Sequence, residues 1–465
     1  IGTSTFGLLH VSPMLMLEEG ASEPKPVKTV PGHFARVVEA TAEDVNMIFG
    51  DEQTAGYFYV GEPLDMEGIR IYLDLKKFVE RSSGVFGKSG TGKTFLTRML
   101  LAGIVKSEVA VSLVFDMHNE YGWKSQDESK SEVKGLRQLF PSGKVAVVTL
   151  DPESSQRRGS KVDFTVTIGY DQLEPEDVEM LQGLMGLSDV QVGALYAIRR
   201  RLGRSWIARL LSDERPTEMQ DMIDSGQIHE GTLGAIQRKL SLFQRFGFLK
   251  PTVMDNVVDK LLDHINTGTH IVLEFGRYGN SLEAYILVAN YLTRRIHQKY
   301  VERKEAAQGT GRDEPKPLVI TIEEAHKFLD PAIAGQTIFG TIARELRKYN
   351  VTLLIVDQRP SGIDPEVMSQ IGTRVTCLLD DESDIRAVFS GVSGGSELRN
   401  VLARLDTRQQ ALILGHAVPM PVVIRTRDTH TPEYYASLGY SAGDDLQKKL
   451  EKNKRALGRD GSGLD

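Results

Sequence analysis

Two hydrophobic patterns alternate along most of the chain. Short, almost wholly apolar runs, which are typical of strands buried on both faces, occur at residues 109–115, 144–150, 270–275, 318–322 and 351–356. Segments with apolar residues three or four positions apart, which is helical spacing, follow several of these runs. Strands that alternate with helices predict an α/β fold with a mostly parallel sheet covered by helices on both faces.

This alternation is interrupted once and flanked by two different segments. Strand patterns disappear over residues 171–265, where helical spacing dominates, so we expect a helical insertion there. The insertion divides the α/β core into residues 84–170 and 266–430. Residues 1–83 form a separate N-terminal domain in this interpretation, and residues 431–465 form a polar C-terminal tail.

The N-terminal segment has the pattern of a small β unit. Runs rich in β-branched and aromatic residues at 32–38, 56–60 and 69–75 are separated by Gly, Pro and Asp, which predicts short strands of a small β-barrel or sheet. Further on, we expect the polar residues 120–143 to form a helical crossover between two core strands.

Composition narrows the class of protein. A chain of 465 residues with 40% hydrophobic residues can form two or three domains. The single cysteine, Cys377, lies in an apolar run and excludes a disulfide framework, which favours a buried thiol and a cytoplasmic location. No apolar run is long enough to span a membrane. The net charge of -7 argues against a surface that is basic all over, although a basic channel inside an assembly is compatible with it.

Residues 84–94 carry the clearest chemical signal. They read Gly-Val-Phe-Gly-Lys-Ser-Gly-Thr-Gly-Lys-Thr and fit the phosphate-binding loop pattern G-x-x-x-x-G-K-[ST] between a strand and a helix. Backbone N–H groups of such a loop converge on phosphate oxygens, and glycines permit the close approach. The pattern predicts ATP and Mg²⁺ as cofactors, with these nucleotide-binding residues: Gly87, Lys88, Ser89, Gly90, Thr91, Gly92, Lys93, Thr94 and Phe95.

Two later strands supply polar groups that fit this loop. The strand at 318–322 delivers Glu323 and Glu324 at its carboxyl end, where ligands bind in open α/β sheets. We expect Thr94 and Glu323 to bind the metal and Glu324 to activate the attacking water. Gln358 follows the next strand, where an amide can sense the γ-phosphate.

Two groups of arginines are open to more than one interpretation. Arg344 and Arg347 lie one helical turn apart between the two strands, where an exposed basic helix face is the simpler interpretation. Residues 199–204 read Arg-Arg-Arg-Leu-Gly-Arg and form a candidate DNA contact, although a solvated or intersubunit helix face accounts for them better.

These motifs together resemble a known family. The loop GKSGTGKT, the strand ending in EEAH, the segment FDMHNEYG and the block IARELRKYNVTLLIVDQRPSGIDPEVMSQ are similar to the HerA branch of the HerA/FtsK superfamily of hexameric ATPases. The resemblance covers roughly residues 55–430. Residues 117–119 depart from it, because Met-His-Asn replaces Pro-His-Gly, and the N-terminal segment is short for a full barrel.

The resemblance implies a RecA-like P-loop NTPase core, an N-terminal small β-barrel, a homohexameric ring and ATP-driven translocation along double-stranded DNA. It implies that Arg344 is an arginine finger supplied to the neighbouring subunit and that Arg81 is a second arginine facing the nucleotide. It also implies a nuclease partner, either NurA-like or a defence effector. A protein-translocating ATPase and a nucleotide-gated scaffold of a nuclease or defence complex remain as alternatives.

Overall fold

One large sheet organises the molecule. The computed structural model describes residues 11, 13–17, 24–126, 132–310, 314–345, 348–392, 395–406 and 409–440. Within them, twelve strands form one sheet, and eight neighbouring strands at one side of it run parallel, as predicted. In order across the sheet the strands are β10 (Phe164–Thr165), β9 (Val145–Thr149), β13 (His270–Glu274), β6 (Val111–Asp116), β14 (Leu318–Glu323), β15 (Val351–Asp357), β5 (Ser83–Phe86), β16 (Thr373–Thr376), β17 (Gln410–Gly415), β18 (Val422–Thr426), β3 (Tyr57–Pro63) and β4 (Ile71–Asp74).

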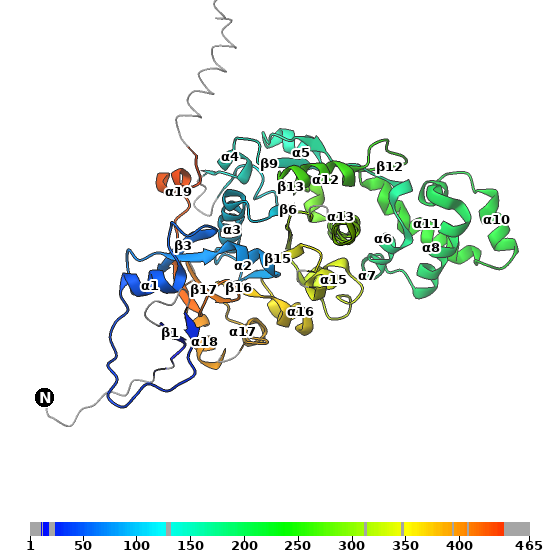
Figure 1. Cartoon of the computed structure of the whole chain (residues 1–465). Coiled ribbons are helices and arrows are strands. Elements are labelled where there is room, and N and C mark those ends of the chain that lie inside the picture. The colour runs from blue at the N-terminus through cyan, green and yellow to red at the C-terminus, as the bar shows by residue number, and fades with distance from the viewer. Residues whose placement is uncertain are drawn as a thin grey trace, which may run out of the picture.

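Helices cover both faces of this sheet, each over its own hydrophobic core (Figure 1). One core contains α1 (Ala42–Phe49), α2 (Leu75–Glu80), α3 (Lys93–Ser107), α4 (Leu136–Leu139) and α19 (Pro432–Ser437). The other contains α12 (Val257–Thr267), α13 (Leu282–Thr310), α14 (His326–Leu329), α15 (Ile338–Glu345), α16 (Pro365–Gln370), α17 (Glu382–Val388) and α18 (Gly395–Leu402).

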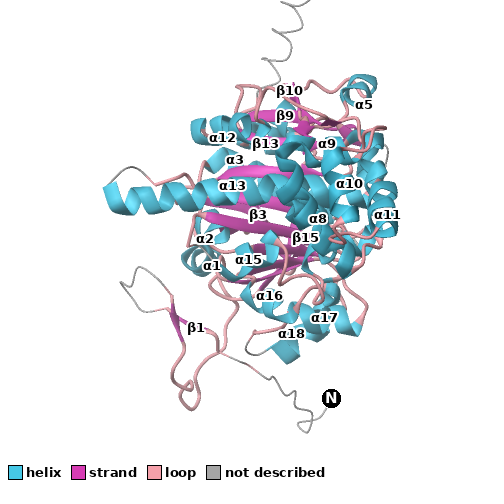
Figure 2. Ribbon diagram, turned by 90° about the vertical axis from the view of Figure 1, so that its right-hand side faces the viewer, coloured by secondary structure: helices cyan, strands magenta, loops and turns pink. Residues whose placement is uncertain are grey.

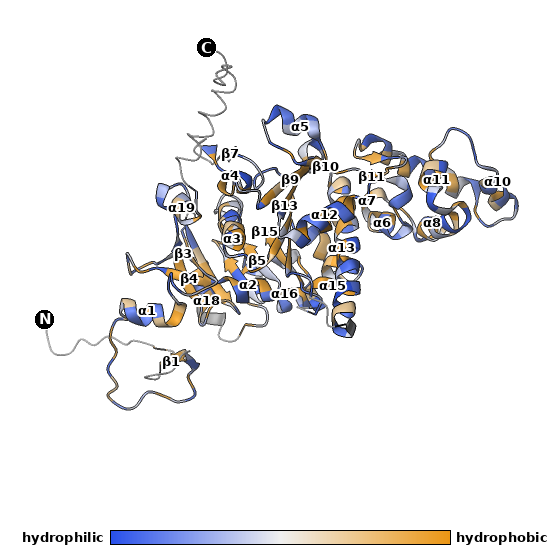
Figure 3. Cartoon of the chain, turned by 45° about the horizontal axis from the view of Figure 1, so that its top comes forward, coloured by the Kyte–Doolittle hydropathy of each residue, from blue (hydrophilic) through white to orange (hydrophobic). Residues whose placement is uncertain are grey.

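The strands divide their side chains between these two cores. In β6, Leu113 and Phe115 lie in the core around α13, whereas Val114 between them lies in the core around α3. This is the two-residue alternation of a strand, and both faces are apolar because both are covered. Figure 3 shows the hydrophobic strands β9, β13 and β15 between helices with more hydrophilic outer sides.

Helices fill most of the segment where we predicted an insertion, which also contains the short strand β12 (Leu249–Lys250). The helices are α6 (Pro175–Glu179), α7 (Gln182–Met185), α8 (Asp189–Leu202), α9 (Trp206–Leu210), α10 (Thr217–Asp224) and α11 (Glu230–Leu240). Figures 1 and 3 show α8, α10 and α11 at one end of the molecule, away from the sheet. The domain boundaries remain predictions.

A buried ion pair attaches these helices to the core. Arg294 Nη2 of α13 lies 2.7 Å from Asp177 Oδ1 of α6, and Arg295 Nη2 lies 3.6 Å from Asp177 Oδ2. The Asp177 side chain is fully buried. Figure 2 shows α13 lying in front of the sheet, roughly along its strands. This helix contacts α12 and α15 of the core and α6 of the insertion.

The expected N-terminal barrel is not confirmed. Strand β3 pairs with β18 and β4 pairs with β3, so the two strands extend the large sheet at its antiparallel edge. The prediction of a strand at 32–38 is wrong, because these residues are exposed and form no strand. Val37 and Val38, for example, are 69% and 81% exposed. Two further strands, β1 (Leu15–Met16) and β2 (Lys25–Pro26), pair only with each other.

Two smaller expectations also change. The described part of 120–143 contains one short helix, α4, and the strand pair β7 (Ser125–Gln126) and β8 (Glu132–Val133), so it is no continuous helical crossover. The predicted polar tail begins with α19, whose Tyr434 is 2% exposed and belongs to the core around α3. Residues 441–465 lie outside the described residues.

The ion pair at Asp177 gives a stability prediction. We expect Asp177→Ala to lower the free energy of unfolding by about 3 kcal/mol, because removing the buried partner of a pair is costly and leaves Arg294 only its 3.8 Å contact with Glu176. Urea unfolding followed by circular dichroism would measure this change. The control is Asp221→Ala, which breaks an exposed pair with Arg201 and should cost less than about 1 kcal/mol. Equal losses in the two variants would contradict the anchoring role of Asp177.

Candidate active site

The phosphate-binding loop joins β5 to α3, as the sequence predicts. The loop backbone is anchored on both sides: Gly87 N donates to Asp357 O at 3.3 Å, and Lys88 N donates to Leu378 O at 3.0 Å. Residues 88–90 at its crest are exposed. The loop is therefore fixed at its base and open to a ligand at its crest.

Glycine is required at three points of this loop. Gly90 and Gly92 have φ angles of 77° and 97°, which lie in the left-handed region that other residues avoid. At Gly87 the obstacle is steric as well, because a Cβ atom would lie 2.7 Å from Cys377 Cβ and 2.8 Å from Thr91 Oγ1. The glycines of the motif thus allow the backbone to curve where side chains would block it.

The first turn of α3 has free backbone donors and a half-buried cation. Gly92 caps this helix without a side-chain hydrogen bond, so no side chain of the cap competes for the N–H groups that bind anions at a helix N-terminus. Lys93 Nζ donates to Lys88 O at 2.9 Å, which folds the ammonium group over the loop. Burial lowers the pKa of Lys93, and the negative charges of Glu324, Asp357 and Glu323 oppose that shift.

Glu323 ends β14 and is buried, with 6% of its surface exposed. Its Oε1 atom accepts a 2.8 Å hydrogen bond from the Tyr121 hydroxyl, whereas its Oε2 atom is buried without a hydrogen-bond partner. Burial, together with the nearby Asp116 charge, raises the pKa of Glu323 to about 8. An unpaired buried carboxylate oxygen is costly unless a cation or a proton compensates it, which fits a metal ligand.

Glu324 follows directly in an unusual conformation. Its φ angle is 49°, a left-handed value that costs a non-glycine residue about 1–3 kcal/mol and is concentrated at functional sites. This turn ends the strand alternation that would direct Glu323 and Glu324 to opposite faces. Gln358 Nε2 lies 3.3 Å from Glu324 Oε2, so the two predicted residues meet.

Asp357 and His326 complete this group, and sequence reasoning assigned them no role. The buried Asp357 carboxylate accepts the His326 backbone N–H at 2.7 Å and lies 2.9 Å from the ring Nδ1 atom. The ring Nε2 atom is 3.7 Å from Glu324 Oε2. His326 therefore links the buried carboxylate to the candidate base, and the only signal in the sequence was its place after the two glutamates.

The two predicted arginines do not reach this site within one chain. Arg344 on α15 pairs with Glu366 at 3.1 Å and with Asp364 at 3.5 Å. Arg81 is exposed and precedes β5, so about 13 Å of strand separates it from the loop. Arg347, the alternative to Arg344, lies outside the described residues.

The residues present fit a nucleotide with Mg²⁺. The glycine-shaped loop, the uncapped start of α3 and Lys93 match a polyphosphate, and the free Glu323 oxygen matches a cation. Thr94 lies in the first turn of α3, where the motif places a metal-binding hydroxyl. Across the described residues, no group of three or more His, Cys, Asp or Glu side chains could hold a metal unaided. A Mg²⁺ ion here would therefore depend on phosphate oxygens as well.

A family comparison covers about half of the chain. Residues 58–296 match the family model described as the central domain of the helicase HerA. The chain belongs to the HerA helicase family. The HerA match begins in β3, continues through the loop and the helical insertion, and ends within α13. By this membership the chain is a P-loop ATPase of the helicase class.

Individual relatives agree with that family. The DNA double-strand break repair helicase HerA of Pyrococcus furiosus is 24% identical, over 88% of this chain and 76% of that protein. The protein of the same name from Sulfurisphaera tokodaii is 26% identical, over 83% of this chain and 71% of that protein.

Solved structures show the same RecA-like fold. The match to the conjugative coupling protein TrwB in complex with sulphate covers 86% of this chain and 96% of the TrwB chain, with 11% identity and a TM-score of 0.53. VirB4 of Thermoanaerobacter pseudethanolicus covers 82% and 99%, with 13% identity and a TM-score of 0.50. None of the helices described here is both long and apolar enough to cross a membrane.

The site predicts different defects for its cation and its carboxylate. Lys93→Ala should abolish productive ATP binding, because the loop then lacks the ammonium group that would contact the phosphates, while Lys88 is paired with Asp380. Glu324→Gln should keep binding but slow hydrolysis by about 10²- to 10⁴-fold, as expected when a general base is lost. Binding of a fluorescent ATP analogue and phosphate release would separate the two effects.

The control for these two variants is Lys106→Ala, which removes an exposed lysine at the far end of α3. It should change neither the binding of the ATP analogue nor the rate of phosphate release. Normal hydrolysis by Glu324→Gln would show that the base is misassigned and would make Glu323 the candidate.

Proposed function

We propose that this chain is an ATP-driven translocase that acts on double-stranded DNA as a homohexameric ring. The observation that carries the proposal is the convergence of the phosphate-binding loop with Glu323, Glu324 and Gln358 at the carboxyl ends of neighbouring strands. Relatives named DNA double-strand break repair helicase favour DNA as the substrate.

Each residue of the site has one task in this proposal. The loop residues 87–92 and Lys93 would bind the phosphates of ATP, and Phe95 lies beside them. Thr94 and Glu323 would hold Mg²⁺, which neutralises the phosphate charge when bound. Glu324 would accept a proton from the attacking water, which Gln358 would orient.

The arrangement of the arginines supports an assembly of several subunits. Neither Arg344 nor Arg81 contacts the loop of its own chain, so each could reach a nucleotide only at a neighbouring subunit. Arg344 is 30% exposed at its side chain, and its partner Glu366 is 67% exposed, so a stronger anion could replace that contact. We therefore propose Arg344 as the finger supplied in trans and Arg81 as a second arginine at the interface.

The arginines at 199–204 are less suited to DNA. Arg199 forms two hydrogen bonds to Glu174, at 2.8 and 3.0 Å, and Arg201 pairs with Asp221. These partners favour the structural interpretation of that cluster. The chain has a net charge of -7, so DNA would have to contact a local basic surface such as the inner wall of a ring.

A nuclease partner, NurA-like or a defence effector, remains part of the proposal on the resemblance alone, as does a cytoplasmic location. Two other functions have weaker support: a protein-translocating ATPase and a nucleotide-gated scaffold of a nuclease or defence complex. Both use the same ATP site, and they differ from the translocase in whether DNA drives hydrolysis.

The DNA substrate is tested by stimulation of hydrolysis. Duplex DNA at low salt should increase the ATPase rate, and the DNA concentration required should rise steeply with salt, because each neutralised phosphate releases counterions. Phosphate release across a salt series measures both effects, with Lys93→Ala as the control for contaminating ATPases. An ATPase rate that does not change when duplex DNA is added would favour the scaffold or the protein-translocating function.

The trans arginine is tested by mixing variants. Arg344→Ala should bind ATP and assemble but lose roughly 10³- to 10⁵-fold in turnover, the usual effect of removing a finger. Adding Glu324→Gln subunits, which keep Arg344, should restore activity at interfaces where an intact Glu324 meets an intact Arg344. Phosphate release and native mass spectrometry would measure recovery and co-assembly.

The matched control for Arg344→Ala is Arg386→Ala, which removes another exposed arginine that pairs with a glutamate of the same chain. It should retain full turnover. Absence of recovery in proven mixed assemblies, or full activity of Arg344→Ala alone, would exclude Arg344 as the finger.

A further inference from the structure

Tyr121 lies in the segment FDMHNEYG and contacts the candidate metal ligand, but none of the assignments above gives it a role in the site. It is fully buried, and its hydroxyl donates to Glu323 Oε1 across 202 residues of sequence. The other oxygen of that carboxylate, Oε2, is buried and has no hydrogen-bond partner. One oxygen of Glu323 is thus occupied by a protein donor, and the other is left for a ligand.

The backbone of Tyr121 is held as firmly as its hydroxyl. Its N–H donates to Asp116 Oδ2 at 2.8 Å, and its carbonyl accepts the Leu136 N–H at 2.8 Å. The same Asp116 carboxylate also accepts the N–H groups of Glu120 at 2.7 Å and Gly122 at 3.2 Å. The turn that presents Tyr121 therefore folds around one buried carboxylate at the end of β6.

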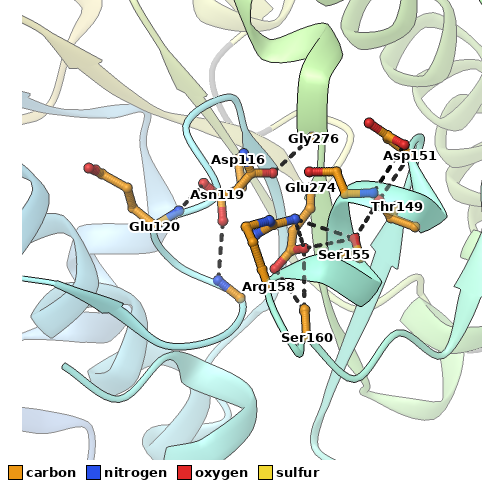
Figure 4. Close-up of polar contacts among 12 residues, drawn as sticks. Asp116, Asn119, Glu120, Thr149, Asp151, Ser155, Arg158, Ser160, Glu274 and Gly276 are labelled. Atoms are coloured by element: carbon orange, nitrogen blue, oxygen red, sulfur yellow. Dashed lines mark hydrogen bonds and ion pairs between the residues drawn. The ribbon is translucent and has the colours of Figure 1, made fainter. Parts of the chain in front are cut away.

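A second polar network lies beside Asp116, on the neighbouring strand β13 (Figure 4). Glu274, at the end of the adjacent β13, pairs with Arg158 at 2.7 Å and accepts hydrogen bonds from Ser155 and Ser160. In the close-up, Asp116 and Glu274 lie near each other at the ends of their strands, with the turn at Asn119 and Glu120 beside Asp116. The turn is joined to this end of β13 by Asn119, whose Oδ1 atom accepts the Gly276 N–H at 2.9 Å.

Glu323 itself is fixed from the opposite face of the sheet. The Tyr285 hydroxyl of α13 accepts the Glu323 N–H and donates to the Glu323 carbonyl, both at 3.0 Å. With its backbone held by Tyr285, Glu323 retains freedom only in its side chain. The Tyr121 hydroxyl removes that remaining freedom.

We infer that Tyr121 is a positioning residue that holds the Glu323 carboxylate in the orientation needed to bind a divalent cation. The inference rests on the proposed role of Glu323. A carboxylate that receives a hydrogen bond at one oxygen presents the other without a further cost of rotamer ordering. Such outer partners of a metal ligand typically account for about 10- to 100-fold in metal affinity or activity.

The test compares Tyr121→Phe with the unmodified chain. We expect the Mg²⁺ concentration for half-maximal ATP hydrolysis to rise about tenfold or more, with little change in the KM for ATP at saturating Mg²⁺. A second readout without turnover is the Mg²⁺-dependent rise in Tm in the presence of a non-hydrolysable ATP analogue. That rise should require a correspondingly higher Mg²⁺ concentration.

The matched control is Tyr300→Phe, because Tyr300 is also buried and its hydroxyl donates to the Lys316 carbonyl at 3.1 Å, outside the active site. It should leave both Mg²⁺ titrations unchanged. If Tyr121→Phe fails to fold, Asp116→Asn keeps the hydroxyl but weakens the turn that presents it, and should shift the titrations in the same direction.

Two failures are distinguishable. A folded Tyr121→Phe protein with the Mg²⁺ dependence of the unmodified chain would overturn the positioning role and leave the proposed function intact. If the unmodified chain shows neither ATP hydrolysis nor Mg²⁺-dependent stabilisation by the analogue, the proposed function itself fails.

Discussion

The site depends on the register of four parallel strands. Strand β15 lies between β14 and β5, and their pairing places Glu323 opposite Val356 and Asp357 opposite Phe86. The register between β14 and β6, continued by two residues, brings Asp116 level with Glu323. All four strands thus end at one edge, where their polar residues meet. A slip of one residue in any pair would turn these side chains to the opposite face.

Local patterns were enough to predict the centre of this site. The phosphate-binding loop, the apolar strands and the residues Glu323, Glu324 and Gln358 each carry a signal within a few positions, and parallel strands bring their carboxyl ends together. Tyr121, Asp357 and His326 lie within the segments that resemble the HerA branch, but nothing in those segments assigns their contacts. Tyr121 and Glu323, for example, are 202 residues apart, and a tyrosine in a polar segment can equally well lie on the surface or pack in a core.

The prediction of an N-terminal barrel failed for a related reason. Strands β3 and β4 have the short, aromatic pattern of a small β unit, but that pattern does not specify a partner. Strand β3 pairs with β18, which lies more than 350 residues later, and β4 pairs with β3. The two strands therefore extend the sheet instead of closing a barrel. Arg344 and Arg81 illustrate the same limit, because a single chain does not contain the neighbouring surface that their proposed roles require.

Cys377 places a constraint on how the chain can change. Its Cβ atom lies where a Cβ at Gly87 would have to go, with only 2.7 Å between them, and the thiol is buried in the core around α3. A larger side chain at position 377 would therefore clash with the phosphate-binding loop, just as a side chain at position 87 would clash with Cys377. Two positions almost 300 residues apart share one small volume, so tolerance for substitution at either one is set by the size of the other.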